Sequence, residues 1–207
     1  MTLPCTAVIL AGGLNTRFGG TNKAFLTVGG RRILDRLMDL CAGRFEAVVI
    51  VTNDPVAYLE WDCTLTADLF SIRSSMTGIH AGLFCAPTDH AFVMACDTPF
   101  LTGAVVETIL DRLTPETDVV VPQTAAGFEP LCAVYSRRCL GPLSRNIAAG
   151  RFQIRGIFRK VRLRTVSEQR LREVDPDLTS FFNINTPEDL ARAEAVLDAN
   201  ATAEEIS

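Results

Sequence analysis

Residues 6–23 read TAVILAGGLNTRFGGTNK, an apolar run followed by a glycine-rich loop that carries one arginine and one lysine. The run Thr6–Ala11 is β-branched and aliphatic, without polar alternation, which is typical of a strand buried on both faces of a parallel sheet. The pair Gly12-Gly13 follows at its carboxyl end, where open α/β sheets bind their ligands. Glycine has no Cβ, so backbone N–H groups there can approach a polyanion. With the cations Arg17 and Lys23 added, the stretch predicts a phosphate-binding loop.

The spacing of this loop differs from two well-known glycine loops. A dinucleotide fingerprint needs G-x-G-x-x-G, whereas here the glycines form two adjacent pairs, Gly12-Gly13 and Gly19-Gly20. A P-loop needs lysine directly after its last glycine and then Ser or Thr, but Lys23 comes later and is followed by Ala24. An ordinary strand-to-helix connection is the alternative, and the two cations favour phosphate binding over it.

Strand-like and helix-like segments alternate along almost the whole chain. Apolar, β-branched runs predict strands, and apolar residues three and four positions apart predict helices. The expected strands are 6–11, 45–52, 63–67, 90–95, 118–122, 131–135, 161–166 and 181–185. The expected helices are 33–41, 74–85, 105–113, 138–149, 152–158 and 186–199. This alternation is typical of α/β proteins, so we expect a single Rossmann-like three-layer sandwich with a mostly parallel, mixed central sheet and helices on both faces.

Length and composition indicate a soluble globular protein. The chain has 207 residues, of which 48% are hydrophobic and 21% charged, enough to bury a core within one domain. We expect that domain to span residues 1–199 and a flexible tail to span residues 200–207. No apolar run approaches the roughly 18 residues of a membrane-spanning helix, and the amino terminus lacks a basic signal region, so we expect a cytoplasmic protein. The seven cysteines include no C-x-x-C pair and are expected to be buried thiols.

Basic residues are concentrated in one part of the chain. Residues 137–172 hold ten arginines and one lysine against a single acid, Glu168. A solvated surface is one explanation, and a surface for an anionic partner is the other. Aromatic residues hardly interleave with these arginines and the overall pI is near 5.2, so we expect no nucleic-acid partner.

Asp97 is the leading candidate for metal binding. It directly follows the expected strand 90–95, so its carboxylate should emerge at the same sheet edge as the glycine loop. A carboxylate beside a triphosphate is repulsive unless a cation lies between them, and Mg²⁺ binds one or two carboxylates together with phosphate oxygens. The alternative is that Asp97 caps the next helix.

Four further polar residues lie at expected strand ends. Asn183 and Asn185 flank Ile184, so in a strand both would face one side, where they could contact an acceptor or a second metal, or else bond turn backbone. Asn53 and Asp68 end two other strands, where a carboxylate could accept from the N–H groups of guanine and an amide could reach its carbonyl or a ribose hydroxyl. Either could also be an ordinary turn residue.

Four motifs together resemble the molybdenum cofactor guanylyltransferase (MobA) family of the nucleotidyltransferases. They are LAGGLNTRFGGTNKAFLTVGG, ACDTPFL, EPLCAVYSR and FFNINTPEDL, in this order and spacing. The first motif fits nucleotidyltransferases generally, and the combination of the last three is more specific. Related cytidylyltransferases typically have LAAG in the first motif, so Gly12 favours a guanylyl donor. Where the family usually has Gly-Pro-Leu, this chain has Ser74-Ser75-Met76, a departure that bears on how the ribose or the acceptor is held.

The resemblance implies Mg²⁺-dependent transfer of GMP from GTP to the terminal phosphate of molybdenum-molybdopterin, with release of diphosphate. Attack would be in line, without a protein nucleophile, and the catalytic residues would be Arg17, Lys23 and Asp97. Molybdoenzyme apoproteins or other cofactor-assembly proteins are further candidate partners. The implied GTP contacts are Leu10, Ala11, Gly12, Gly13, Lys23, Asn53, Asp68 and Asp97, of which Asp97 also binds the metal.

Two other functions stay open at the level of sequence. One is a cytidylyl or sugar-nucleotide transferase of the same fold, and the other is a non-catalytic carrier of pterin or nucleotide. A carrier does not need a metal-bridging carboxylate, so Asp97 favours an enzyme. The basic stretch 137–172 is a candidate seat for the anionic pterin, on charge alone.

Overall fold

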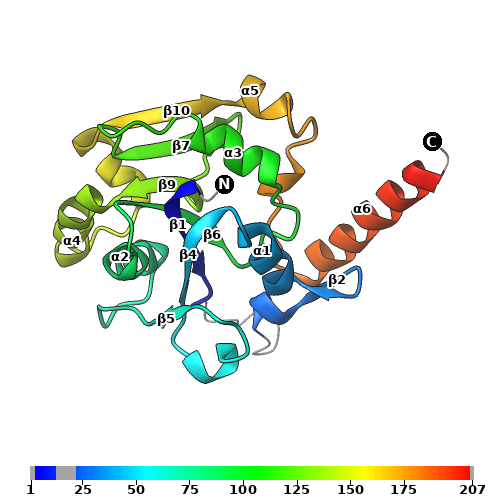
Figure 1. Ribbon diagram of the computed structural model, residues 1–207, viewed down its shortest axis with the longest axis horizontal. Coiled ribbons are helices and arrows are strands. Elements are labelled where there is room, and N and C mark those ends of the chain that lie inside the picture. The colour runs from blue at the N-terminus through cyan, green and yellow to red at the C-terminus, as the bar shows by residue number, and fades with distance from the viewer. Residues whose placement is uncertain (1–2, 13–21, 206–207) are drawn as a thin grey trace.

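One mixed β-sheet forms the centre of the molecule. The computed structural model describes residues 3–12 and 22–205, and within them eight strands join in the order β10-β7-β9-β6-β1-β4-β5, with β8 paired to β7 (Figure 1). The strands of this sheet are β1 (Leu3–Leu10), β4 (Phe45–Val51), β5 (Thr64–Thr66), β6 (His90–Ala95), β7 (Val119–Thr124), β8 (Gly127–Phe128), β9 (Cys132–Ser136) and β10 (Leu163–Ser167). A small antiparallel pair, β2 (Thr27–Val28) and β3 (Arg31–Arg32), lies apart from it.

The expected glycine-loop strand lies at the centre of this sheet. β1 is parallel to both β4 and β6, with Ile9 opposite Ile50 on one side and Met94 on the other. β5 continues the parallel order beyond β4, whereas β9 runs antiparallel between β6 and β7. The carboxyl ends of β1, β4, β5 and β6 therefore lie at one edge, where open α/β sheets hold ligands.

Helices cover both faces of the sheet, which confirms the expected three-layer fold. α1, α3, α5 and α6 contribute to one buried cluster, and α2 and α4 contribute to the other. β1 contributes to both buried clusters, since Ala7 and Ile9 pack into the first cluster and Val8 packs into the second. The helices are α1 (Ile33–Cys41), α2 (Ser75–Cys85), α3 (Gly103–Leu110), α4 (Leu140–Ala148), α5 (Glu168–Arg172) and α6 (Pro187–Glu205).

Short 3₁₀ turns connect several of these elements. They are η2 (Lys23–Phe25), η3 (Pro55–Tyr58), η4 (Arg137–Cys139), η5 (Ile154–Lys160) and η6 (Thr179–Phe181). The helix expected over 152–158 is thus a 3₁₀ segment. α6 continues to Glu205, beyond its expected end at Ala199, and projects from the body of the molecule (Figure 1). The flexible tail over 200–207 and the single domain over 1–199 stay predictions.

The strand expected over 181–185 is wrong. The segment leaves η6 as irregular backbone, and Ile184 makes a single backbone bond, from its N–H to the Asp97 carbonyl at 2.9 Å. Two local features explain this path. Leu178 has a left-handed φ of 56°, which turns the chain, and the Asn183 amide donates to the Phe181 carbonyl, which competes with ladder pairing.

α2 packs unusually close to β1, because glycine faces the strand. A Cβ on Gly82 would lie 2.3 Å from the Val8 Cγ1. The helix begins at a capping box in which the Ser74 hydroxyl accepts from the Thr77 N–H at 3.2 Å and the Thr77 hydroxyl accepts from the Ser74 N–H at 2.9 Å. None of the helices in the described residues is long and apolar enough to cross a membrane.

Candidate active site

The chain leaving β1 is held between the neighbouring strands at the carboxyl edge. The Leu10 carbonyl accepts from the Cys96 N–H at 3.1 Å, and the Ala11 N–H donates to the Val51 carbonyl at 2.9 Å. Gly12 comes next, and a Cβ there would lie 3.4 Å from the Asn53 Nδ2. Gly13 and Arg17 lie outside the described residues. The structure thus places Leu10, Ala11 and Gly12 at the expected ligand edge.

Lys23 joins three segments that are far apart in the sequence. Its ammonium lies 3.3 Å from the Asp97 Oδ2 and donates to the Asn185 Oδ1 at 2.8 Å. Asp97 follows β6, Asn185 precedes α6, and Lys23 begins η2. The Asp97 and Lys23 side chains are both about one-fifth exposed, at 19% and 18%, so their attraction is screened less than that of a surface pair. The structure brings these three expected site residues together.

The second Asp97 oxygen is available for a metal. Its Oδ1 is buried and has no hydrogen-bond partner among residues 3–12 and 22–205. A buried carboxylate oxygen without a hydrogen-bond partner costs free energy, and it is a suitable ligand for a divalent cation. The described residues include no group of three or more acidic, histidine or cysteine side chains that could hold a metal ion. Mg²⁺ usually binds one or two carboxylates together with phosphate oxygens and waters. The helix-cap alternative is wrong, since Thr102 caps α3 through its hydroxyl.

Asn53 and Asp68 form a second polar pair at the same edge. The Asn53 Nδ2 donates to the Asp68 Oδ2 at 3.0 Å, and the Asp68 Oδ1 is buried without a hydrogen-bond partner in the part of the chain that the structure describes. The pair follows β4 and β5, on the opposite side of β1 from Asp97. Its free carboxylate oxygen can accept from an N–H donor that enters beside Gly12.

The two asparagines near α6 have different contacts. Asn185 belongs to the Lys23 cluster, and its backbone N–H donates to the Asp189 Oδ2 at 3.0 Å. Asp189 also accepts from the Thr186 N–H, and these backbone bonds, first that from Asn185, lower the pKa of Asp189. The cap of α6 therefore fixes Asn185. Asn183 is exposed and bonds the Phe181 carbonyl, so its side chain does not join the cluster.

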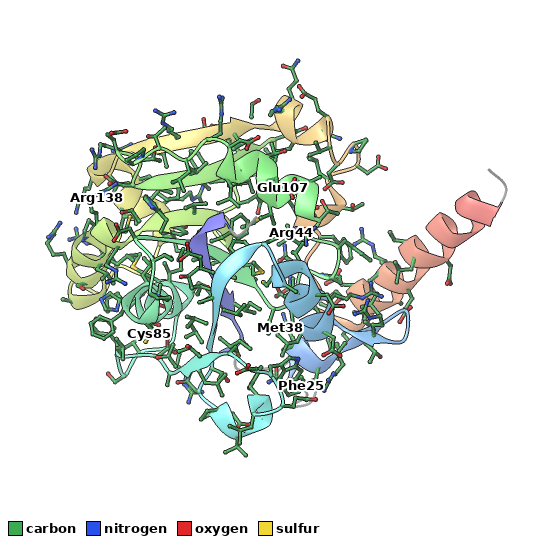
Figure 2. The ribbon with its side chains drawn as sticks, in the orientation of Figure 1. Phe25, Met38, Arg44, Cys85, Glu107 and Arg138 are labelled. Atoms are coloured by element: carbon green, nitrogen blue, oxygen red, sulfur yellow. The ribbon has the colours of Figure 1, made fainter. Side chains whose placement is uncertain are left out.

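The basic stretch divides into paired and unpaired cations. Arg138 and Arg162 both contact Asp118, at 2.6 and 3.1 Å, and Arg138 lies far from Phe25 of η2 (Figure 2). Arg151 and Arg155 are exposed, and within the described part of the chain neither has an ion-pair partner. These two arginines precede or begin η5, at the turn that follows α4.

Two residues beside the cluster carry no clear sequence signal. Asn22 immediately precedes Lys23, and its Nδ2 donates to the hydroxyl of Tyr58, which is 36 positions away. Tyr58 is fully buried. An asparagine before a short helical turn predicts a cap, but nothing in the sequence connects it with this tyrosine.

Comparison with known proteins gives a consistent result. The family model of the MobA-like NTP transferase domain matches residues 7–166. The chain is 52% identical to the molybdenum cofactor guanylyltransferase of Desulfosudis oleivorans, over 94% of this chain and 96% of that protein. It is 31% identical to a probable molybdenum cofactor guanylyltransferase of Natranaerobius thermophilus, over 95% and 98%.

Solved structures show the same fold. The molybdopterin-guanine dinucleotide biosynthesis protein A of Archaeoglobus fulgidus superposes with a TM-score of 0.79 at 28% identity, covering 94% of this chain and 99% of that one. A 4-diphosphocytidyl-2C-methyl-D-erythritol synthase from Anaerococcus prevotii superposes with a TM-score of 0.68 at 14% identity, covering 94% and 96%, and shares the fold alone.

Proposed function

Because this chain belongs to the MobA-like NTP transferase family, we propose that it transfers GMP from GTP to the phosphate of molybdenum-molybdopterin, releasing diphosphate. The observation that carries the proposal is the cluster of Lys23, Asp97 and Asn185 at the sheet edge reached by Gly12. It combines a cation for phosphate with a carboxylate whose second, buried oxygen has no hydrogen-bond partner among the described residues, and both are suited to nucleotidyl transfer.

The donor nucleotide fits the side of the edge formed by β1, β4 and β5. Gly12 lets the triphosphate approach the backbone that leaves β1. Asp68 has one oxygen fixed by Asn53 and one that no described residue contacts by a hydrogen bond, so it can accept from the adjacent N–H donors of guanine. Cytosine offers an acceptor at its ring nitrogen instead, so this carboxylate favours a guanine donor. Leu10, Ala11 and Gly13 complete the proposed backbone contacts.

The acceptor phosphate attacks the α-phosphorus of GTP in line. A phosphate monoester is already largely ionised near neutral pH, so no protein group has to act as nucleophile, and the protein contributes mainly position and charge. Lys23 and Arg17 neutralise the triphosphate and the departing diphosphate. Asp97 holds the metal, which we propose to be Mg²⁺, and this metal supplies charge neutralisation on the phosphate oxygens.

We place the acceptor on the other side of Asp97, toward the half of the sheet formed by β9, β7 and β10. Asn185 is rigidly held by the cap of α6 and can orient the incoming phosphate. Arg151 and Arg155 form no ion pair with any described residue and are candidates for binding the anionic pterin. Asn183 stays a weaker candidate for acceptor or second-metal contact. We propose molybdoenzyme apoproteins or other cofactor-assembly proteins as further partners, and a cytoplasmic location.

The test compares donors and acceptors with the purified protein. Diphosphate release is measured with GTP or CTP as donor, and with molybdenum-molybdopterin or a sugar phosphate as acceptor. The proposal expects release only with GTP and the pterin acceptor. Preference for CTP or for the sugar phosphate would assign another transferase activity, and binding of the pterin without release under any combination would support a carrier.

A further inference from the structure

The phenol of Tyr58 contacts both chain segments that flank residues 13–21. Tyr58 ends η3, and its hydroxyl accepts from the Asn22 Nδ2 at 2.7 Å and donates to the Ala11 carbonyl at 3.4 Å. Ala11 follows β1, and Asn22 immediately precedes Lys23. One buried hydroxyl thus connects the end of the central strand with the start of the turn that carries the lysine.

Both polar atoms of the Asn22 side-chain amide form hydrogen bonds. Its Oδ1 accepts from the Ala24 N–H at 3.1 Å and caps η2, while its Nδ2 donates to Tyr58. These two bonds fix the orientation of the amide. Because the cap sets the backbone of η2, and Lys23 is the first residue of that turn, the origin of the Lys23 side chain is fixed relative to Tyr58.

Tyr58 is itself held by an aromatic cluster. Its ring centroid lies 5.0 Å from that of Phe25 and 5.9 Å from that of Trp61, and the Trp61 indole donates to the Asp35 carboxylate of α1 at 3.3 Å. Phe25, labelled in Figure 2, belongs to the same turn as Lys23. Burial raises the pKa of Tyr58 to about 12, so the hydroxyl keeps its proton throughout the neutral range.

We propose that Tyr58 and Asn22 are positioning residues, which hold the Lys23 ammonium in place for the phosphates of GTP through the Ala11–Tyr58–Asn22 bonds. The inference rests on the proposed function. Loss of the hydroxyl leaves the Ala11 carbonyl and the Asn22 amide without their buried partner, so η2 and Lys23 shift. Small displacements of a charge that contacts a polyanion have large effects on binding and rate.

The test is a double-mutant cycle on the affinity for Mg²⁺-GTP, measured by equilibrium titration without any acceptor. Tyr58→Phe alone is expected to weaken binding about tenfold, the scale of a modest misplacement. In a Lys23→Ala background the same substitution is expected to change the affinity by less than about twofold, because the group through which it acts is absent. Equal effects in both backgrounds would overturn the proposal.

Two further variants separate positioning from general loss of stability. Tyr135→Phe is the matched control, since Tyr135 is also fully buried and donates to a backbone carbonyl, that of Pro130, at 2.7 Å. It is expected to lower Tm as Tyr58→Phe does but to leave GTP affinity unchanged. Asn22→Ser keeps a capping oxygen, removes the donor to Tyr58 and should reproduce the Tyr58→Phe loss if that variant fails to fold.

These readouts are independent of the acceptor. If wild-type protein binds Mg²⁺-GTP but releases no diphosphate with any acceptor, the proposed function is contradicted. The double-mutant cycle on GTP affinity can still be measured in that case. If transfer is observed and Tyr135→Phe weakens GTP binding as much as Tyr58→Phe does, the function stands and the positioning role is contradicted.

Discussion

At the residue scale, the two oxygens of Asp97 have different environments. Oδ2 lies 3.3 Å from the Lys23 ammonium, whereas Oδ1 is buried and no described residue forms a hydrogen bond with it. We expect Asp97→Asn to lower the transfer rate by about 100-fold or more, because it removes charge from the point where the phosphates react. Diphosphate release measures the rate. Asp62→Asn, at an exposed position, is the control, and a wild-type rate in Asp97→Asn would contradict the assignment.

Substitution of Gly12 tests its proposed contact with GTP without disturbing the fold. A Cβ there would meet the Asn53 Nδ2 at 3.4 Å, an ordinary contact distance, so Gly12→Ala should change the free energy of unfolding by less than about 0.5 kcal/mol. The same methyl group would stand where phosphate approaches the backbone, so KM for GTP is expected to rise about tenfold or more. Steady-state kinetics and urea unfolding check the two halves. Unchanged KM would remove Gly12 from the donor site.

The sequence predicts the location of those site residues that directly follow a strand. Asp97 directly follows β6, which is parallel to β1, so its place at the carboxyl edge is a consequence of parallel topology. Lys23 begins η2, and its contact with Asp97 is seen only in the structure. Tyr58 could not be found in this way. Its role depends on a hydroxyl that reaches Asn22 and Ala11 across a buried aromatic cluster, and no local pattern encodes that contact.

At the element scale, Asp118 links β7 to the segments that precede α4 and β10. It contacts Arg138 and Arg162 at 2.6 and 3.1 Å. Burial alone would raise the pKa of Asp118, but hydrogen bonds from Arg162 and Arg138 hold it well below its usual range. A lowered pKa in the folded state stabilises the fold above the unfolded pKa, and this stabilisation is lost as the pH falls through the folded value.

Asp118→Asn should therefore lower the free energy of unfolding at neutral pH by about 1 to 3 kcal/mol. The effect is limited to this range because both arginines are about half exposed, so solvent screens their attraction to Asp118. The difference from wild type should shrink as the pH is lowered into the acid range. Urea unfolding at several pH values measures it. Asp39→Asn, which removes an exposed pair with Arg31, is the control and should cost less than about 0.5 kcal/mol. A pH-independent difference would contradict this account.

The contact of α2 with β1 gives a second element-scale prediction. A Cβ on Gly82 would lie 2.3 Å from the Val8 Cγ1, and Val8 is fully buried in the central strand. Gly82→Ala is expected to destabilise the fold by about 1 to 3 kcal/mol through overpacking, in spite of the better helix propensity of alanine. Thermal unfolding measures this. Raised stability would show that the helix can shift away from the sheet.

The sequence correctly predicts the strands that have a continuous apolar run. The segments 6–11, 45–52 and 90–95 are mostly apolar, because β1, β4 and β6 are covered on both faces. The segment 181–185 also has apolar residues, but side-chain bonding by Asn183 and the left-handed turn at Leu178 redirect it. Such local competition is not visible in hydrophobic pattern alone.

At the scale of the whole molecule, the sheet order separates the proposed donor side of the site from the proposed acceptor side. Asn53 and Asp68 lie beyond β1 on one side, and β9, β7 and β10 extend beyond β6 on the other. Asp97 follows β6, between these two halves, so a reaction between their ligands would take place beside it. The exposed Arg151 and Arg155 are expected to contribute to the acceptor half.

Arg151→Glu combined with Arg155→Glu should raise KM for the pterin acceptor about tenfold or more, since each change places a negative charge where an anion is expected to bind. KM for GTP should stay within about twofold of wild type. Steady-state kinetics with each substrate varied in turn checks both values. Arg170→Glu, at an exposed arginine already paired with Glu173, is the control for surface charge. Unchanged acceptor KM in the double variant would leave these arginines as a solvated surface.

The central claim is that a nucleotidyl group passes from GTP to a phosphate acceptor. The most direct measurement follows radioactive phosphate from GTP labelled at either the α or the γ position, with molybdenum-molybdopterin as acceptor. Transfer of GMP places the α label in the pterin product and the γ label in diphosphate. Appearance of the γ label in the pterin product, or retention of both labels in unreacted GTP, would contradict the account.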